Sequence, residues 1–434
     1  MNKKLIALVI AGLVSMPALA DTSNVTLYGT LNAGVDNASN VGGTTANQTT
    51  NNAGRVSDYG SYFGLKGSED VGSGTSAIWQ IEQGVAVNGG NGTQSGGLNG
   101  GGANGNSPFG SNQFNNQRNT FVGLSNQAAG TVLVGIHDTP YKMATANMDP
   151  FADTLGDYNG LVGSFSQAGS YYNNGVTTAN GLQNANGTVG ALGGAGASDY
   201  FDLRPSQVLA YVSPSYAGAT LIAAYVFGGS QATGTAGQQT GYAQSYALEY
   251  DASKTLDVPL YLTASYEQHN FGTAGTGTGT LGFAGLAGGQ NSAWKLGASY
   301  TLMGATLSAL YEDSTDNFNN GSNLFGHNTW YGSVKYPIGA FDINFAYAVS
   351  GNDNSAGTAY GVGAAGASTG ATQTTIGGDY NFSKNTQVYA LYTQIANDAG
   401  AMYNFADTTA PVAFAGAIGG ATIQAYSLGI KHSF

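Results

Sequence analysis

Apolar and polar side chains alternate with a period of two along many short stretches of the chain. In residues 341–349 every odd position is large and apolar, and every even position is polar or alanine. Residues 258–269, 293–301 and 304–312 repeat the pattern, with Leu310 as an apolar exception on the polar side. Since successive side chains of a strand point to opposite faces, each stretch is predicted to be a β-strand with one apolar and one polar face.

Strand-like stretches recur along the chain, with bounds that we expect to shift by a few residues. They are 25–35, 60–68, 75–85, 117–125, 130–137, 205–213, 219–227, 243–251, 258–269, 293–301, 304–312, 328–336, 340–349, 373–381, 386–396 and 422–434. In water, all these apolar faces would need a second layer to bury them. In a membrane, lipid covers them and the polar faces line a lumen. The predicted fold class is therefore all-β, a transmembrane antiparallel β-barrel of about 16 strands.

The last stretch shows most plainly why a closed barrel is favoured. Its apolar face carries Tyr426, Leu428, Ile430 and Phe434. Only His432 breaks the alternation. A strand this apolar at the open edge of a soluble sheet would invite aggregation, whereas a closed barrel in lipid has no edge.

Short and long connections alternate between the predicted strands. The short turns, near 68–74, 126–130, 213–218, 303–304, 337–340 and 383–385, are rich in glycine, proline, asparagine and serine. The long connections are 36–59, 86–116, 138–204, 270–292, 350–372 and 397–421. Outer-membrane barrels have short periplasmic turns and long extracellular loops, so this alternation supports the barrel. No fixed-period repeat or domain boundary is visible.

The first twenty residues have the features of a secretory signal. Lys3 and Lys4 precede an apolar run at 5–14, and Ala18-Leu19-Ala20 forms a small-x-small cleavage site. We expect residues 1–20 to be a signal peptide, cleaved before Asp21, and residues 21–434 to form the barrel. The alternative is an uncleaved amphipathic anchor.

Composition narrows the class of protein further. Only 8% of the residues are charged, while tyrosine (27) and glycine (69) are very frequent and cysteine is absent. These values fit a barrel with aromatic girdles and glycine-rich loops, and they exclude a disulfide framework. The formal charge of −12 becomes −14 when Lys3 and Lys4 are removed. So acidic a chain is not expected to bind nucleic acid.

Four segments resemble one family. VTLYGTLNAGV at 25–35 and SYFGLKGSEDVG at 61–72 resemble its opening strands and first periplasmic turn. FVGL at 121–124, followed by AGTV at 129–132, resembles its fourth and fifth strands, and the chain terminus resembles its assembly signal. The family is that of the Gram-negative general porins, and the subgroup is the neisserial and beta-proteobacterial one.

The resemblance implies a homotrimer of sixteen-stranded barrels in the cell outer membrane, exported through the periplasm. It implies outer-membrane lipid and the barrel assembly machinery as partners, the latter through the signal at Tyr426, Leu428, Ile430 and Phe434. It further implies passive diffusion of small hydrophilic solutes and ions, narrowed by a third loop that folds inward. No cofactor or metal is expected.

In the resembled family the third loop carries acidic groups. Here this loop, called loop 3 below, begins after His137 and runs to about Arg204. Asp149, Asp153 and Asp157 lie four residues apart, so one helical turn would place them on one face. We predict that they form the acidic part of the pore constriction, the alternative being carboxylates that merely solvate a surface loop.

The facing wall of such porins carries arginines, and this chain has few. Where the subgroup often has arginine in its second strand, Tyr62 stands here, and Gly135-Ile136-His137 lacks another. We predict a basic and polar pore wall made of Arg118, Arg204, Lys66 and Tyr62. The alternative for each basic residue is a charge on the rim or on a loop. With few cations in the lumen and a negative total charge, a preference for cations is expected.

Two alternatives use the same barrel in other ways. One is a solute-specific channel, because the long loop 138–204 could plug or shape the pore. The other is an adhesin or structural surface protein with a closed lumen. An enzyme is not expected, because the histidines at 137, 269, 327 and 432 are scattered and no local motif supports a catalytic triad.

Overall fold

The computed structural model describes residues 24–41, 53–88, 118–164, 201–227, 241–270, 290–317, 323, 326–354, 368–401, 403–405 and 420–434. Residues 1–20, the expected signal peptide, lie outside this part of the chain. The strands are β1 (Asn24–Val41), β2 (Ala53–Asp58), β3 (Tyr62–Gly72), β4 (Thr75–Gly84), β5 (Thr120–Asn126), β6 (Gly130–Ile136), β7 (Val208–Val212), β8 (Ala219–Phe227), β9 (Tyr242–Asp251), β10 (Leu260–Asn270), β11 (Gln290–Leu302), β12 (Ala305–Asp316), β13 (Asn328–Ile338), β14 (Phe341–Ser350), β15 (Ala371–Asn381), β16 (Thr386–Asn397) and β17 (Thr422–Ser433). The short helices are α2 (Pro140–Met143), η1 (Ala146–Met148), η2 (Tyr158–Gly160) and α4 (Ser253–Leu256).

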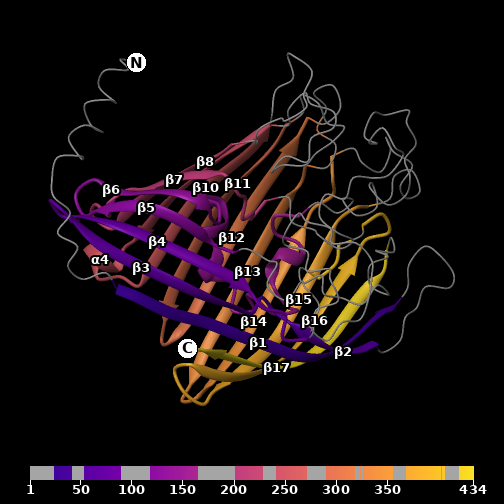
Figure 1. Cartoon of the computed structure of the whole chain (residues 1–434). Coiled ribbons are helices and arrows are strands. Elements are labelled where there is room, and N and C mark those ends of the chain that lie inside the picture. The colour runs from indigo at the N-terminus through magenta and orange to yellow at the C-terminus, as the bar shows by residue number, and fades with distance from the viewer. Residues whose placement is uncertain are drawn as a thin grey trace, which may run out of the picture.

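All 17 strand segments belong to one antiparallel sheet that closes on itself (Figure 1). Closure comes from β1, which pairs with β17 from Thr30 to Val41 and with β2 and β3 on its other side. Because β2 and β3 follow one another along β1, they form one interrupted strand, and the 17 segments make a 16-strand barrel. The predicted all-β barrel is confirmed.

The predicted bounds were wrong at one place. Residues 36–59 were expected to be a loop, yet β1 continues to Val41 and β2 begins at Ala53. Here β1 and β2 extend beyond the residues in which apolar and polar side chains alternate. Their side chains are mostly polar or small, so hydrophobic periodicity does not predict a strand there.

The two faces of the wall follow the predicted alternation. On β14, Phe341 is 56% exposed and Ile343 52%, whereas Asn344 and Ala346 on the other face are 1% and 4% exposed. Leu310, the exception in the pattern, does point inward and is buried. The outer surface is thus a band of exposed apolar side chains suited to lipid, and the polar positions face the lumen.

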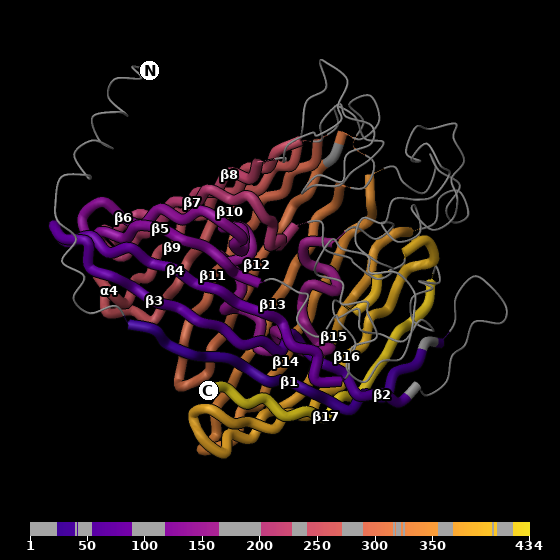
Figure 2. Tube along the Cα trace, in the orientation of Figure 1, coloured from indigo at the N-terminus to yellow at the C-terminus, as the bar shows by residue number. Residues whose placement is uncertain are grey.

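The C-terminal end of the chain pairs with β1 and closes the barrel. Phe434 and Gly29 exchange backbone hydrogen bonds of 3.0 and 3.1 Å, while Tyr426, Leu428 and Ile430 point outward and are exposed. Short turns such as Met303-Gly304, where both residues have positive φ, join the strands at one rim (Figure 2). No helix among the described residues is long and apolar enough to cross a membrane.

Candidate functional site

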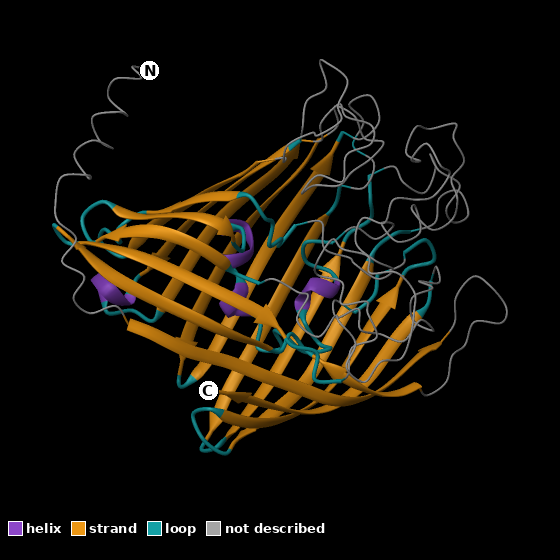
Figure 3. Cartoon of the chain, viewed as in Figure 1, coloured by secondary structure: helices purple, strands orange, loops and turns teal. Residues whose placement is uncertain are grey.

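Loop 3 enters the barrel and crosses its lumen. Its described parts are residues 137–164 and 201–207, and the three short helices of these parts, α2, η1 and η2, lie inside the ring of strands (Figure 3). Wall side chains bind its backbone. Ser333 Oγ donates to Met148 O (2.7 Å), and Gln373 Nε2 donates to Asp157 O (3.0 Å). These bonds to β13 and β15 hold the loop at the level of the wall.

Apolar contacts fasten the same side of loop 3 to the wall. Buried loop residues pack in one cluster with wall residues from β12 to β17, namely Met148, Phe151, Leu155, Leu161 and Val162 with Leu310, Leu391, Ile395 and Ile423. The approach is so close at Gly156 that a Cβ there would lie 2.6 Å from Thr375 Cγ2. Loop 3 is therefore packed against one side of the lumen, and the wall from β1 to β6 faces it from the other side, with β1 also bonded to the loop from Asn32 Nδ2 to Asp153 O (2.7 Å).

A row of aromatic and charged side chains lines the facing wall. The Arg118 guanidinium lies 4.5 Å from the centre of the Tyr62 ring, and its Nε is 3.7 Å from Glu82 Oε2. Tyr28 donates its hydroxyl to Glu82 Oε1 (3.0 Å), and the Lys66 ammonium lies 4.8 Å from the Tyr28 ring centre. The structure thus places Tyr62, Lys66 and Arg118 together on the inner face. Whether they act as the pore wall remains a prediction.

Arg204 belongs to a second group beside this row. Its Nε lies 2.9 Å from Asp138 Oδ1, and Lys142 Nζ lies 3.5 Å from the same oxygen. Burial alone would raise the pKa of Asp138, but Lys142 and Arg204 together hold it below its usual range. Asp138 is therefore a charged bridge within loop 3, between Lys142 on its first described part and Arg204 on its second.

Sequence reasoning missed Glu82 and Asp138. A signal existed for Glu82, because Gln80 and Glu82 alternate with Trp79 and Ile81 along β4, as an inward face alternates with an outward one.

Asp149 does not project into open space. It is buried, and its carboxylate accepts hydrogen bonds from the hydroxyl of Tyr331 (2.8 Å) and from the backbone N–H groups of Phe151 and Tyr158 (2.9 Å each). Burial raises the pKa of Asp149 to about 6. This geometry is that of an anchor between loop 3 and β13.

Asp153 and Asp157 have different surroundings. The Asp153 side chain is 55% exposed and lies 3.7 Å from Lys431 Nζ. Asp157 caps η2, accepting from Asn159 N (2.9 Å) and from Asp153 N (3.2 Å). The expected helical turn does not form, because Asp149 has an extended backbone and Asp153 has a φ of 56°. The three carboxylates therefore do not share a face.

Comparison with known proteins agrees with the barrel. A family model described as Gram-negative porin matches residues 6–400. The chain belongs to this family. Among its relatives, the major outer membrane protein P.IA of Neisseria meningitidis serogroup B is 31% identical over 185 residues, 38% of this chain and 41% of the relative. P.IB of Neisseria lactamica is 46% identical over 92 residues, 21% of this chain and 26% of the relative. The matched part thus spans less than half of these relatives.

Solved porins share the fold of this porin. An anion-selective porin from Comamonas acidovorans has a TM-score of 0.63 at 20% identity, covering 95% of this chain and all of that one. OmpT of Vibrio cholerae has a TM-score of 0.57 at 14% identity, with 95% and 100% covered. At these identities the likeness concerns the fold alone. Family and fold together place this porin in the outer membrane of a Gram-negative cell.

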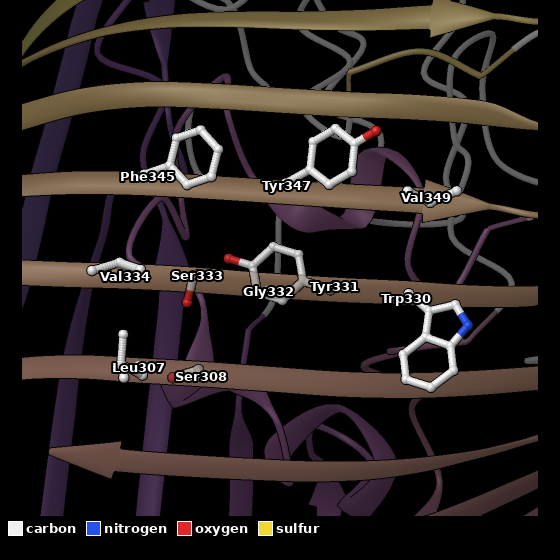
Figure 4. A pocket seen from close by; sticks show the side chains of 10 residues that line it. All are labelled: Leu307, Ser308, Trp330, Tyr331, Gly332, Ser333, Val334, Phe345, Tyr347 and Val349. Carbon is white, nitrogen blue, oxygen red and sulfur yellow. The ribbon is translucent and has the colours of Figure 1, made fainter. Parts of the chain in front are cut away.

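The outer surface of the porin carries a shallow apolar groove, lined by Leu307, Trp330, Val334, Phe345 and Tyr347 around Gly332 (Figure 4). It opens toward lipid and takes no part in the lumen. Within the part of the chain that the structure describes, no three histidine or acidic side chains converge as a metal site.

Proposed function

We propose that this porin is a passive, water-filled channel for small hydrophilic solutes and ions. The observation that carries the proposal is the uneven filling of the lumen. Loop 3 turns its apolar side to β12–β17, and exposed charged groups remain between it and the opposite wall. Lys66 on β3 and Asp153 on loop 3 are both exposed, which supports a hydrated gap between them.

Charged side chains of both signs lie beside this gap, five basic and three acidic. Basic side chains at Lys66, Arg118, Lys142, Arg204 and Lys431 face carboxylates at Glu82, Asp138 and Asp153. Ion sorting in a channel depends on the charges at the narrowest point, so the total of −14 is a poor guide. The expected cation preference finds no support in this geometry. We propose instead a weakly selective passage, with Asp149 acting as an anchor of the loop.

The expectations on processing and assembly stay proposals. We propose cleavage of residues 1–20 before Asp21, and assembly as a homotrimer in lipid with help from the barrel assembly machinery. Mass spectrometry of the exported protein and its mass in detergent would test them.

Planar-bilayer recording of the purified porin tests the channel. We expect stepwise conductance, and in a salt gradient a reversal potential near zero, corresponding to a permeability ratio within roughly threefold of one. Strong cation selectivity would contradict this mixture of charges beside the gap. Absence of steps from folded protein would contradict the channel and favour a closed-lumen surface protein. Uptake of sized sugars into proteoliposomes would separate a general pore from a solute-specific one.

A further inference from the structure

Lys295 on β11 is buried inside the barrel. Its side chain is 0% exposed, and its Nζ donates to Asp202 Oδ1 over 2.5 Å. Asp202 lies on the returning limb of loop 3, just before the chain rejoins the wall at β7. An unpaired ammonium in such a place would lose its hydration without compensation, so this contact is costly to break.

The carboxylate of Asp202 also binds the outgoing limb of loop 3, which is residues 137–164. Its other oxygen accepts from Asn159 Nδ2 (2.8 Å) and from the Tyr158 hydroxyl (3.3 Å). The Lys295 ammonium lies 4.0 Å from the centre of the Tyr141 ring, which belongs to α2 at the start of the loop. One wall cation therefore contacts both described parts of loop 3, Tyr141 on the first and Asp202 on the second.

β12 adds a second attachment at the same place. Glu312 accepts from the Tyr141 hydroxyl (2.7 Å) through one oxygen and from Gly163 N (2.8 Å) through the other. Burial and the nearby Glu312 raise the pKa of Tyr141 well above its usual range, so its hydroxyl stays a donor. The wall thus binds the loop through Lys295 on β11 and Glu312 on β12, which are neighbouring strands.

The cluster holds more acidic than basic groups. Asp202, Glu267 and Glu312 are all buried, and Lys295 is the lysine among them. His269, also buried, pairs with Glu267 at 2.9 Å and stacks on Phe201 of the returning limb at 5.1 Å. Loss of the ammonium would leave adjacent carboxylates buried without their partner, and moving Asp202 into water would relieve this most directly.

We propose that Lys295 is the positioning residue for loop 3, and that its ammonium keeps the returning limb docked and thereby sets the width of the passage. The statement on width rests on the proposed channel function. The statement on docking does not, because the position of the loop can be measured without conduction.

The test uses a buried cysteine as a reporter of docking. The chain has no cysteine, and Leu155 of loop 3 is 0% exposed in the apolar contact with the wall. In a Leu155→Cys background, we expect a water-soluble maleimide to label the folded barrel at least about tenfold faster when Lys295→Met is added. Lys335→Met, which removes a lysine that is 46% exposed on β13, is the matched control and should leave the rate unchanged.

Two further variants guard against misfolding and a merely steric effect. Asp202→Asn keeps the lysine and its packing, and should also speed labelling. The charge exchange Lys295→Asp with Asp202→Lys should restore slow labelling, since it returns an ion pair to the same place. Unchanged labelling in both single variants, with the barrel folded by its heat-modifiable mobility in gel electrophoresis, would overturn the proposal, and so would an exchange that labels as fast as Lys295→Met.

Conductance separates this inference from the proposed function. Channels that the parent forms should change their conductance in Lys295→Met and regain it in the exchange variant. If the parent forms no channels, the proposed function fails while the labelling result still decides the docking role. If the parent conducts and Lys295→Met both conducts and labels like it, the docking role alone is overturned.

Discussion

Tyr331 on β13 donates its hydroxyl to Asp149 of loop 3 over 2.8 Å, deep between the wall and the loop. Through this bond a carboxylate expected in the pore constriction becomes an attachment point of the loop. Tyr331→Phe removes the donor and leaves a buried carboxylate with one partner fewer, so we expect the free energy of unfolding in detergent to fall by about 1–3 kcal/mol. Tyr347→Phe on the lipid-facing side of β14 is the control and should change it little. Equal stability of both variants and the parent would contradict the anchoring role.

Titration of Asp149 should be visible as a pH dependence of stability. Its pKa is raised to about 6 in the folded state, against a usual value near 3.9, so the folded state binds the proton more tightly. The stabilisation is full below about pH 4 and is lost as the pH rises through 6. We expect the difference in unfolding free energy between the parent and Asp149→Asn to change in the parent's favour by on the order of 2 kcal/mol from pH 7 to pH 4.5. A difference that stays flat over this window would show that the carboxylate is not buried as described.

Gly156 should tolerate no side chain where it touches β15. A Cβ there would meet Thr375 Cγ2 at 2.6 Å, so Gly156→Ala forces loop 3 and the wall apart. We expect a loss of about 1–3 kcal/mol in unfolding free energy. Thr375→Ser removes the clashing methyl and keeps the hydroxyl near Gly156 O, so the double variant should recover most of the loss. Failure of the second substitution to help would locate the effect elsewhere.

Removing a charge from each side of the gap between loop 3 and the facing wall should change ion selectivity in opposite directions. Arg118→Gln removes a positive charge from the facing wall, and Asp153→Asn removes a negative charge from loop 3. Reversal potentials in a salt gradient should shift toward cation preference in the first variant and toward anion preference in the second. Shifts of the same sign, or none, would mean that the passage does not run between these residues.

The barrel could be predicted because the alternation of apolar and polar side chains leaves each strand little freedom in its register. A strand with one lipid-facing side cannot slip by one residue without turning every apolar side chain inward. The alternation at 341–349 therefore predicts which side of β14 faces lipid, and the position of Leu310 on the polar side of its stretch predicts the inward side chain that the structure shows. The interrupted strand was missed because its upper part, β2, carries no such alternation.

The arrangement of loop 3 could be predicted only in part. The inward loop followed from a family resemblance, but the spacing of Asp149, Asp153 and Asp157 suggested a helical turn that does not form. Pro150 accounts for this, since the residue before a proline is pushed away from the helical region, and Asp149 is extended. The pair formed by Lys295 and Asp202 is 93 residues apart in sequence. No local pattern marks such a pair, because it depends on how the loop crosses the lumen.

The most direct measurement is the conductance of a porin with one cysteine on the facing wall. Lys66 points into the lumen, and its neighbour Leu65 points toward lipid, so Lys66→Cys and Leu65→Cys form a matched pair in a chain without other cysteines. We expect a bulky, charged, water-soluble thiol reagent to reduce the single-channel conductance of Lys66→Cys in discrete steps and to leave Leu65→Cys unaffected. Conductance in Lys66→Cys that is indifferent to complete modification would contradict a passage along this wall.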